Sequence, residues 1–441
     1  MRNKKIIFGL MSLFCLCTNG YALDLTLDDT VARIVSESND LKKADANVKK
    51  AQASLDAANA NRWFKIDANA TYMNMLNVEH LGSSQGIELP PELGGILGSA
   101  LDADMSNLEI PDNIFTAGVS ITQPIYTFGK IGNAVDSVRS AIKMSETSRE
   151  MTRREIVYSA TDMYWTAKMT DEIVKLAKKD LNNAIASREQ LTSAGRANRS
   201  NLVKIESDIA TKEINLSDAR FNRDTAHRML KIFAGIDVDE EINLVDDFPK
   251  TFSTMEIKKL EKTPQWDVLN QQVMMYESQA SSKRANAYPT LAATGSYSYS
   301  SMANEARHMF DSKGGQNAYW GLALQVPLFS GGLNKANATV DAMNAEAARQ
   351  DLEKSKKIVS EQYNNAIKQY NHLRDNLKNL ENARDLAAKA FEYSQQRFSS
   401  GQTSAVELSE VASGLYQLDM ALLNAKYKIL MSAESVKKLG E

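Results

Sequence analysis

The residue types that most often carry chemistry occur in this chain, but their spacing does not assemble a catalytic or metal-binding site. No metal-ligand spacing joins the four histidines, which are His80, His227, His308 and His372. The segment Gly82–Gly86 formally fits the G-x-S-x-G pattern of a nucleophile elbow, but no apolar strand precedes it and no helix follows it. The segment Gly331–Lys335 lacks the spacing of a phosphate-binding loop. We therefore expect no enzyme activity, no cofactor and no bound metal.

Two glutamates have a spacing that invites a functional interpretation. Glu407 and Glu410 lie three residues apart near the start of a predicted helix, so both carboxylates project from one helical face. On the residues alone, the pair fits an ordinary solvated helix start whose acids suit the helix dipole.

The elements that position these residues occur twice along the chain. Residues 60–72 align with residues 285–297, and Ser193-Ala194-Gly195 aligns with Ser399-Ser400-Gly401. A duplication of about two hundred residues is far longer than a solenoid repeat, so each copy is a large unit. Each copy has the order helix, strand, loop, strand, long helix and shorter helix. The turns from strand to long helix are marked by Pro124 and Gly129 in the first copy and by Pro327 and Gly332 in the second.

The N-terminal residues predict export. Arg2, Lys4 and Lys5 precede a short apolar run, and Gly20-Tyr21-Ala22 offers a small-residue cleavage site, so residues 1–22 are interpreted as a signal peptide. Its removal takes away both cysteines of the chain and leaves no thiol for a disulfide. The nearly balanced charge, −3 for the full chain, argues against a nucleic-acid partner.

Two stretches predict very long helices. Glycine is absent from residues 133–194 and 334–400, and proline is absent from 125–248 and 328–441. Such stretches favour uninterrupted helices, each roughly 90–100 Å long at about 1.5 Å per residue. Gly195 and Gly401 then permit the left-handed turn that reverses the chain. A narrow heptad seam with many small residues in the second stretch suits helices packed side by side.

Four shorter segments alternate in polarity as half-buried strands do. They lie near residues 66–74, 119–125, 291–299 and 320–328, and each is about as long as a tilted membrane strand. Four aromatic side chains suit an interfacial girdle: Tyr297, Tyr299, Tyr319 and Trp320. Open strand edges are not tolerated in lipid, so a membrane location requires several copies of the chain. The alternative is a secreted structural coiled-coil protein, such as a fibre, without channel activity.

The order of these motifs resembles the TolC-like outer membrane efflux protein family. The family's Gln-Pro-Leu-Phe-x-x-Gly pattern is similar to residues 123–129 and, with valine for glutamine, to residues 326–332. Another similar stretch begins with Arg397-Phe398-Ser399-Ser400-Gly401 and continues through Leu415-Tyr416 to Asn424-Ala425-Lys426-Tyr427. The resemblance covers the whole mature chain, in order and in both copies.

The resemblance implies a mainly helical fold with a small β part. The expected assembly is a homotrimer with a 12-stranded outer membrane β-barrel, four strands per chain, continuous with a long periplasmic α-helical barrel. The expected parts of each chain are the signal peptide (1–22), the first repeat (23–235), an inter-repeat equatorial segment (236–263) and the second repeat (264–441). Residues 83–113 and 302–317 are expected to be extracellular loops.

The resemblance also implies a gate where the helical barrel narrows. Glu407 and Glu410 are then expected to form the periplasmic gate ring, with Arg196, Arg199 and Lys204 as possible ion-pair partners. The turns expected to contact an adapter are Ala194, Gly195 and Arg196, and Ser400, Gly401 and Gln402. The family's better-known members close this gate with a tyrosine and an arginine, where this chain has Phe398 and Thr403.

The implied function is that of an exit channel in the outer membrane of a Gram-negative bacterium. Such a channel passively conducts substrates from a periplasmic adapter and an inner membrane pump, proton-driven or ATP-driven, to the exterior. It would serve a tripartite efflux pump or a type I secretion system, and its partners include outer membrane lipid. The sequence leaves the cargo, the pump and the adapter open.

Overall fold

The computed structural model describes residues 23–74, 112–193, 199–303, 305–308 and 314–440. The chain divides into two compact units, and each contains parts of both sequence repeats. We call residues 49–143 and 271–349 the sheet unit, and residues 1–48, 144–270 and 350–441 the hairpin unit. Four helices, α2 (Asn39–Ala60), α4 (Lys130–Ser193), α6 (Pro264–Ala285) and α7 (Leu333–Ser399), contribute residues to both.

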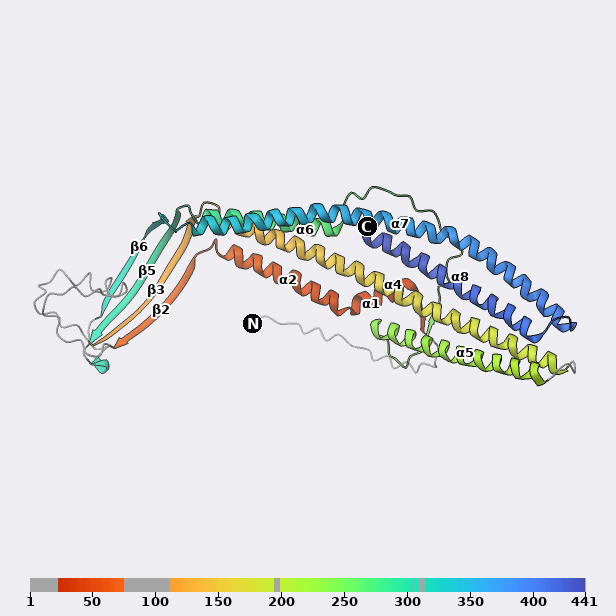
Figure 1. Cartoon of the computed structure of the whole chain (residues 1–441). Helices are drawn as coiled ribbons and strands as arrows, with labels where there is room; N and C mark the ends of the chain where they lie inside the picture. The colour runs from red at the N-terminus through yellow and green to blue at the C-terminus, as the bar shows by residue number, and fades with distance from the viewer. Residues whose placement is uncertain (1–22, 75–111, 194–198, 304, 309–313, 441) are drawn as a thin grey trace, which may run out of the picture. The chain divides into compact units, whose positions relative to one another are not determined.

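The sheet unit holds one antiparallel sheet in the order β2-β3-β5-β6 (Figure 1). Its strands are β2 (Lys65–Asn74), β3 (Asn113–Tyr126), β5 (Thr290–Ala303) and β6 (Gly315–Gln325). The two copies of the repeat therefore meet where β3 pairs with β5. Within the described residues, β2 and β6 each pair on one side only, so both outer edges of the sheet keep open backbone groups.

The two faces of this sheet differ in polarity. The register places Ile66 beside Ile121, Ile121 beside Gly295, and Gly295 beside Trp320, which forms one apolar row across all four strands. The side chain of Trp320 is 89% exposed in the isolated chain. Because successive residues of a strand point to opposite faces, the neighbouring row is polar. Tyr319 belongs to that polar row, so its predicted place in an aromatic girdle with Trp320 is wrong.

The strand ends differ in detail from the sequence prediction. Strand β5 continues to Ala303 and β6 already begins at Gly315, so the connection between them is shorter than the predicted loop 302–317. Strand β6 ends at Gln325, before Pro327, which has no N–H to donate to a ladder. The predicted loop 83–113 lies outside the described residues, except for Asp112 and for Asn113, which begins β3.

Left-handed residues lie between each strand pair and its long helix. Phe128 and Gly129 have φ values of 47° and 84°, and Gly331 and Gly332 have φ values of 59° and 83°. Glycine adopts this backbone conformation without the steric cost that a side chain brings. Pro124 lies just before the start of these turns, where the pairing of β3 with β5 shifts its register between Pro124 and Tyr126.

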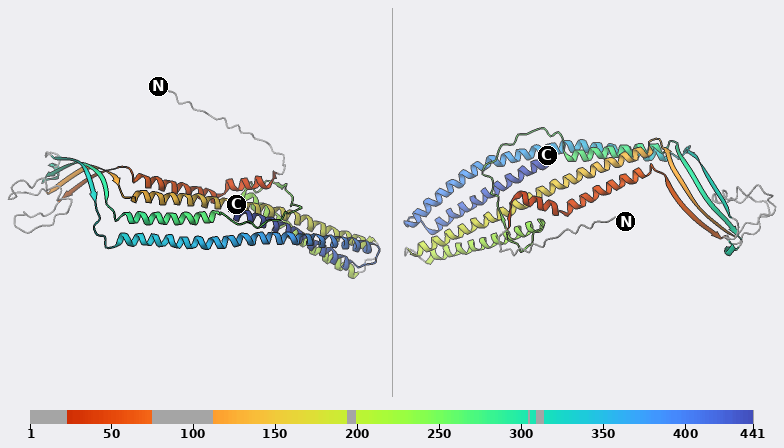
Figure 2. Two further views of the ribbon diagram at one scale, coloured as in Figure 1. Left: turned by 90° about the horizontal axis from the view of Figure 1, so that it is seen from above. Right: turned by 180° about the vertical axis from the view of Figure 1, so that it is seen from behind.

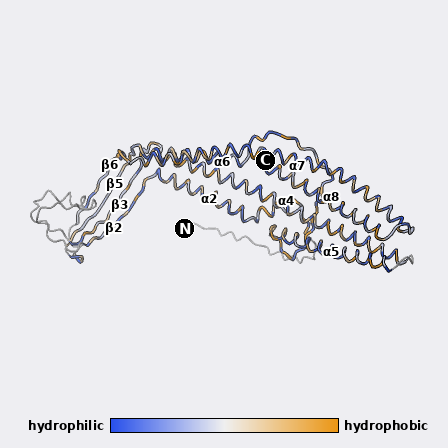
Figure 3. Tube along the Cα trace, viewed as in Figure 1, coloured by the Kyte–Doolittle hydropathy of each residue, from blue (hydrophilic) through white to orange (hydrophobic). Residues whose placement is uncertain are grey.

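The hairpin unit is built from two antiparallel helical pairs, seen from further sides in Figure 2. Helix α4 has 64 residues and α7 has 67, which confirms the two long helices predicted from the missing glycines and prolines. Each returns as a shorter helix, α5 (Arg199–Phe233) or α8 (Ala405–Gly440). Polar and apolar residues alternate along these helices, without long apolar runs (Figure 3). None of the described helices is both long and apolar enough to cross a membrane.

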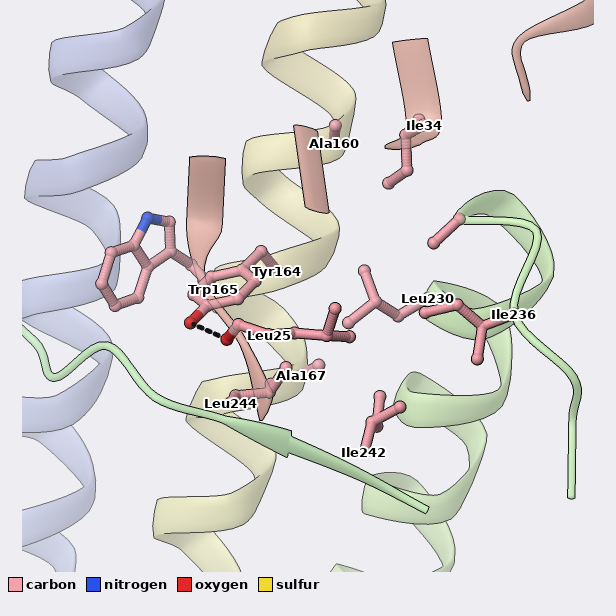
Figure 4. Close-up of a cluster of buried hydrophobic side chains, with 11 residues drawn as sticks. Leu25, Ile34, Ala160, Tyr164, Trp165, Ala167, Leu230, Ile236, Ile242 and Leu244 are labelled. Atoms are coloured by element: carbon pink, nitrogen blue, oxygen red, sulfur yellow. Dashed lines mark hydrogen bonds between the residues drawn. The ribbon is translucent and has the colours of Figure 1, made fainter. Parts of the chain in front are cut away.

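A small apolar core lies where the N-terminal residues and the inter-repeat segment meet α4 and α5 (Figure 4). Strand β1 (Leu23–Leu25) pairs in parallel with β4 (Ile242–Leu244), and helix α1 (Leu27–Glu37) follows directly. Tyr164 of α4 is fully buried there, and its hydroxyl lies 3.2 Å from the carbonyl oxygen of Leu25 and 2.9 Å from Oδ2 of Asp246. Burial raises the pKa of the Tyr164 hydroxyl far above its usual value.

Tyr370 occupies the equivalent place in the second copy. Its hydroxyl donates to the carbonyl oxygen of Ser253 at 2.9 Å, and the neighbouring Asn371 donates to the carbonyl oxygen of Met255 at 2.8 Å. Both long helices therefore use a buried tyrosine to hold the segment that joins the two repeats. The two tyrosines are 206 positions apart, as are Gly195 and Gly401.

Candidate functional site

The turn between α7 and α8 is a closed glycine cap. Gly401 has a φ of 78°, its N–H donates to the carbonyl oxygen of Phe398, and the N–H of Gln402 donates to that of Arg397. These two backbone hydrogen bonds form a Schellman motif, which satisfies carbonyl groups at the end of a helix. Ser404 then caps α8, because its Oγ accepts from the N–H of Glu407 at 3.2 Å. The backbone on both sides of the turn is thus fixed by local hydrogen bonds.

Glu407 lies in the first turn of α8 and is held by its own hairpin. The hydroxyl of Thr403 donates to Oε2 of Glu407, and Nη1 of Arg397 lies 3.7 Å from Oε1. The Arg397 and Glu407 side chains are 55% and 51% exposed, so solvent screens this ion pair strongly. A second nitrogen of Arg397 donates to the carbonyl oxygen of Gln402 at 3.3 Å.

Glu410 lies one turn further along, beside a groove of about 220 Å³ between α5 and α8. The groove is lined by Lys204, Ile205, Ser207, Asp208, Ala405, Val406, Ser409 and Glu410. Ser409 donates a 2.8 Å hydrogen bond to Oδ2 of Asp208 and so joins the two helices. Lys204 and Glu410 therefore border the same groove from opposite helices.

A buried charge cluster lies next to this groove. Nζ of Lys212 on α5 lies 2.7 Å from Oδ2 of Asp180 on α4 and 3.8 Å from Oδ1 of Asp208. Lys212 and Asp180 are only 5% and 7% exposed. Burial raises the pKa of the Asp180 carboxyl, although the hydrogen bond from Lys212 opposes this effect. Through Asp208 and Ser409, the cluster links α4, α5 and α8.

A second acid–base contact joins α4 to α5 further from the turn. Oδ1 of Asp171 lies 2.7 Å from Nε of Arg223 and 3.0 Å from Nε2 of the buried His227. Burial raises the pKa of the Asp171 carboxyl, but the interactions with His227 and Arg223 outweigh burial and leave this pKa below its usual value. The other hairpin has the reverse arrangement, with the base Arg384 on α7 and the acid Asp419 on α8, 2.7 Å apart.

The structure places some of the predicted site residues together and leaves others apart. In the described part of the chain, neither Arg199 nor Lys204 forms an ion pair with Glu407 or Glu410. Ala194, Gly195 and Arg196 lie outside the described residues. Lys204 and Glu410 do share a groove, and the partner of Glu407 is Arg397, a residue that sequence reasoning had not connected with it.

Sequence reasoning also missed the buried cluster of Asp180, Asp208 and Lys212. A charged residue in a long polar helix looks the same in sequence whether it faces solvent or a neighbouring helix. The available signal was its spacing: Asp208 and Lys212 lie four residues apart and so on one face of α5, four residues being about one helical turn.

The sequence comparisons both match this chain to outer membrane proteins. A sequence model described as "Outer membrane efflux protein" matches residues 31–235 and 258–439. The chain is 20% identical over 418 residues to the probable outer membrane lipoprotein SilC of Salmonella typhimurium, which covers 91% of this chain and 83% of SilC.

Solved structures show the same fold. The crystal structure of CusC is similar with a TM-score of 0.76 and 15% identity, over 97% of this chain and 96% of CusC. The outer membrane protein VceC of Vibrio cholerae is similar with a TM-score of 0.74 and 17% identity, over 94% of this chain and 96% of VceC.

Proposed function

The chain belongs to the outer membrane efflux protein family, and from this membership we propose that it is the passive exit channel of a tripartite efflux pump or a type I secretion system. Efflux channels of this family work in the outer membrane together with periplasmic adapters and inner membrane pumps. The family is one of channels and not of enzymes. Membership in it leaves the alternative of a secreted fibre without support.

The open sheet is the observation that supports an assembly of several copies. Its four strands have one apolar face and two unpaired edges, and lipid tolerates such edges only in a closed barrel. Three copies would join β6 of one chain to β2 of the next and supply twelve strands, an even number as in known outer membrane barrels. We propose this homotrimer, with residues 23–235 and 264–441 as the two repeats and 236–263 as their equatorial connection.

The helical turns are the proposed periplasmic end of the channel. We assign the gate ring to Glu407 and Glu410, because both lie in the first two turns of α8 beside the Gly401 cap. Carboxylates from three chains around one axis would attract cations and repel anions wherever the passage is narrow. The turns 194–196 and 400–402 are the proposed contacts for the adapter, whose pump sets the cargo.

Conductance across a planar lipid bilayer tests this proposal. We expect the purified protein to form cation-selective channels that multivalent cations block from the periplasmic side. Replacing Glu407 and Glu410 together with alanine should weaken both selectivity and block. The matched control is Glu392→Ala, which removes an exposed acid of α7 and should leave both properties unchanged. Absence of any conductance would contradict the channel, whereas full block in the double variant would contradict only the gate assignment.

A further inference from the structure

The two hairpins are related by a constant difference in residue number. Tyr164 corresponds to Tyr370 and Gly195 to Gly401, and the first residues of α5 and α8 are Arg199 and Ala405, so each pair differs by 206. The relation holds from the buried tyrosines through the turns into the shorter helices. Each position in one hairpin therefore has an equivalent position in the other.

The contact to transpose is the one between α5 and α8 within a chain. Here Asp208 of α5 accepts a hydrogen bond from Ser409 of α8, and Lys204 and Glu410 border the groove beside it. Adding 206 to the α5 residues turns Lys204 into Glu410 and Asp208 into Gly414. Subtracting 206 from the α8 residues turns Ser409 into Val203 and Glu410 into Lys204. Lys204 and Glu410 thus exchange places.

The equivalent residues lie on one surface of α5 and one surface of α8. Both surfaces are exposed in the single chain, and their shapes and charges complement each other. Val203 is 59% exposed, and an added Cβ at Gly414 would meet nothing within 4 Å. An apolar side chain on one surface then faces a glycine without a side chain on the other. At the border of the same contact, a lysine faces a glutamate, so the charges are complementary as well.

We propose that α8 of one copy packs against α5 of a second copy in the way that α8 packs against α5 within the chain. Val203 of one copy lies against Gly414 of the next, and Lys204 of the first pairs with Glu410 of the second. This inference rests on the proposed trimer and assigns the seam between its chains. The occupant of the exposed α5 surface is therefore another copy of this protein.

The seam differs from the contact within the chain in its interior chemistry. The buried cluster of Asp180, Asp208 and Lys212 corresponds at the seam to Leu386, Gly414 and Leu418. Leu386 is 66% exposed in the single chain, as expected for a side chain that a second copy covers. Within each chain the contact combines a buried apolar cluster that includes Ile205, Ala405 and Leu408 with the ion cluster, whereas at the seam an apolar contact with a bordering ion pair holds neighbouring chains together.

The seam also changes the charge of the proposed gate. Around the axis, three Glu410 side chains alternate with three Lys204 side chains, so that level carries no net charge. Glu407 corresponds to Asn201, which is neutral, so its level keeps the negative charge. The attraction for cations then comes from Glu407, and Glu410 holds the chains together.

Paired cysteines test the seam directly, because the chain without residues 1–22 contains no cysteine. The test variant is Val203→Cys with Gly414→Cys, and the matched control is Asp208→Cys with Ser409→Cys. Both are oxidised, or treated with a short bifunctional thiol reagent, in the detergent-solubilised full protein. We expect covalent dimers and trimers on a denaturing gel for the test pair, and monomers cross-linked within the chain for the control.

Co-expression makes the result independent of contacts within a chain. When one tagged chain carries only Val203→Cys and a differently tagged chain carries only Gly414→Cys, a disulfide between the two tags requires the seam. Native mass measurement of the same samples reports the assembly. An intact trimer without cross-links between chains would overturn the seam and leave the channel proposal standing. Absence of any oligomer would overturn both.

Discussion

The two helical hairpins share a backbone plan and apolar packing between their helices, but the first hairpin also contains a buried ion pair. In the first, α4 and α5 pack through an apolar cluster that includes Leu181, Ile209 and Leu216. They add the buried pair of Asp180 with Lys212 and a half-buried contact of Asp171 with Arg223 and His227. In the second, α7 and α8 pack through an apolar cluster that includes Tyr370, Leu377 and Ile429. Among the described residues, this hairpin also has two interhelical ion pairs, Arg384 with Asp419 and the more exposed Arg397 with Glu407, and in both the base lies on α7 and the acid on α8.

This difference teaches that helix pairing in the fold does not depend on one kind of contact. Apolar packing between two helices loses stability in proportion to the apolar area that is removed. A buried ion pair is strongly destabilising once one partner is missing, because the other charge stays buried without a partner. The ion cluster of the first hairpin also contacts α8 of the second hairpin in the same chain, because Lys212 lies beside Asp208 and Asp208 accepts a hydrogen bond from Ser409. The polar contacts thus help to join the two hairpins of one chain.

The largest expected effect comes from removing the buried cation of the first hairpin. Lys212→Met leaves Asp180 buried without its partner, which costs about 3–5 kcal/mol in comparable cases. The thermal midpoint of trimer dissociation in detergent should fall steeply. The matched control is Leu418→Met at the equivalent position of the second hairpin, where a volume-conserving change costs less than about 1.5 kcal/mol.

A double variant separates the ion pair from the packing around it. Changing both Asp180 and Lys212 to leucine copies Leu386 and Leu418 of the second hairpin, and such replacements are often neutral or stabilising. We expect the double variant to recover most of the midpoint lost in Lys212→Met. A double variant as unstable as the single one would show that the first hairpin requires charges in its interior.

A smaller effect is expected when the exchanged ion pair of the second hairpin is removed. Arg384→Met leaves Asp419, whose side chain is 11% exposed, without its 2.7 Å partner. Because Arg384 itself is 31% exposed and water can replace it in part, we expect a loss of about 1–2 kcal/mol. Lys178→Met is the control, since Lys178 is the exposed equivalent in the first hairpin. Equal losses in the two variants would contradict a structural role for the pair.

The sequence predicts the course of the chain better than the interior of the hairpins. The missing glycines and prolines locate α4 and α7 to within a few residues, and polarity alternation finds all four strands of the sheet. What decides the interior is which side of a polar helix faces its neighbour, and Lys212 looks in sequence like any solvated lysine. The pairing of Glu407 with Arg397 depends likewise on the geometry of the Gly401 cap.

The pH dependence of stability should separate the two acids of the first hairpin. The pKa of Asp171 is lowered in the folded state, so its stabilising contribution is present above the unfolded pKa of about 3.9 and is lost as pH falls through the folded pKa. The pKa of Asp180 is raised, so its contribution has the opposite sign: it is present below the unfolded pKa of about 3.9 and is lost as pH rises through the higher folded pKa. Asp171→Asn should therefore flatten the fall of the dissociation midpoint on acidification.

Asp180→Asn provides the comparison, because it removes a group that titrates in the opposite sense. Its midpoint should fall more steeply than that of the unmodified protein as the pH is lowered from the raised pKa of Asp180 towards the unfolded value of about 3.9. Both variants are compared with the unmodified protein under the same conditions, so only the differences between the curves are interpreted. Parallel curves for the two variants would contradict the opposite pKa shifts.

The smallest effect on stability is expected at the Gly401 turn. Arg397 and Glu407 are half exposed and 3.7 Å apart, and exposed pairs of this kind contribute about 0–1 kcal/mol. The equivalent of Arg397 in the first hairpin is the buried Leu191, so this pair exists in one hairpin only. Arg397→Gln should leave the dissociation midpoint nearly unchanged while it removes the positive charge that pairs with Glu407. If Glu407 lines the passage, multivalent cations should then block the channel at lower concentration, and the change should shrink at high salt because exposed charges are screened.

Thr403→Val, which removes only the hydroxyl that donates to Glu407, is the control without a change in charge. Unchanged block in Arg397→Gln at low salt would place Glu407 away from the narrow part of the passage and leave it an ordinary helix start.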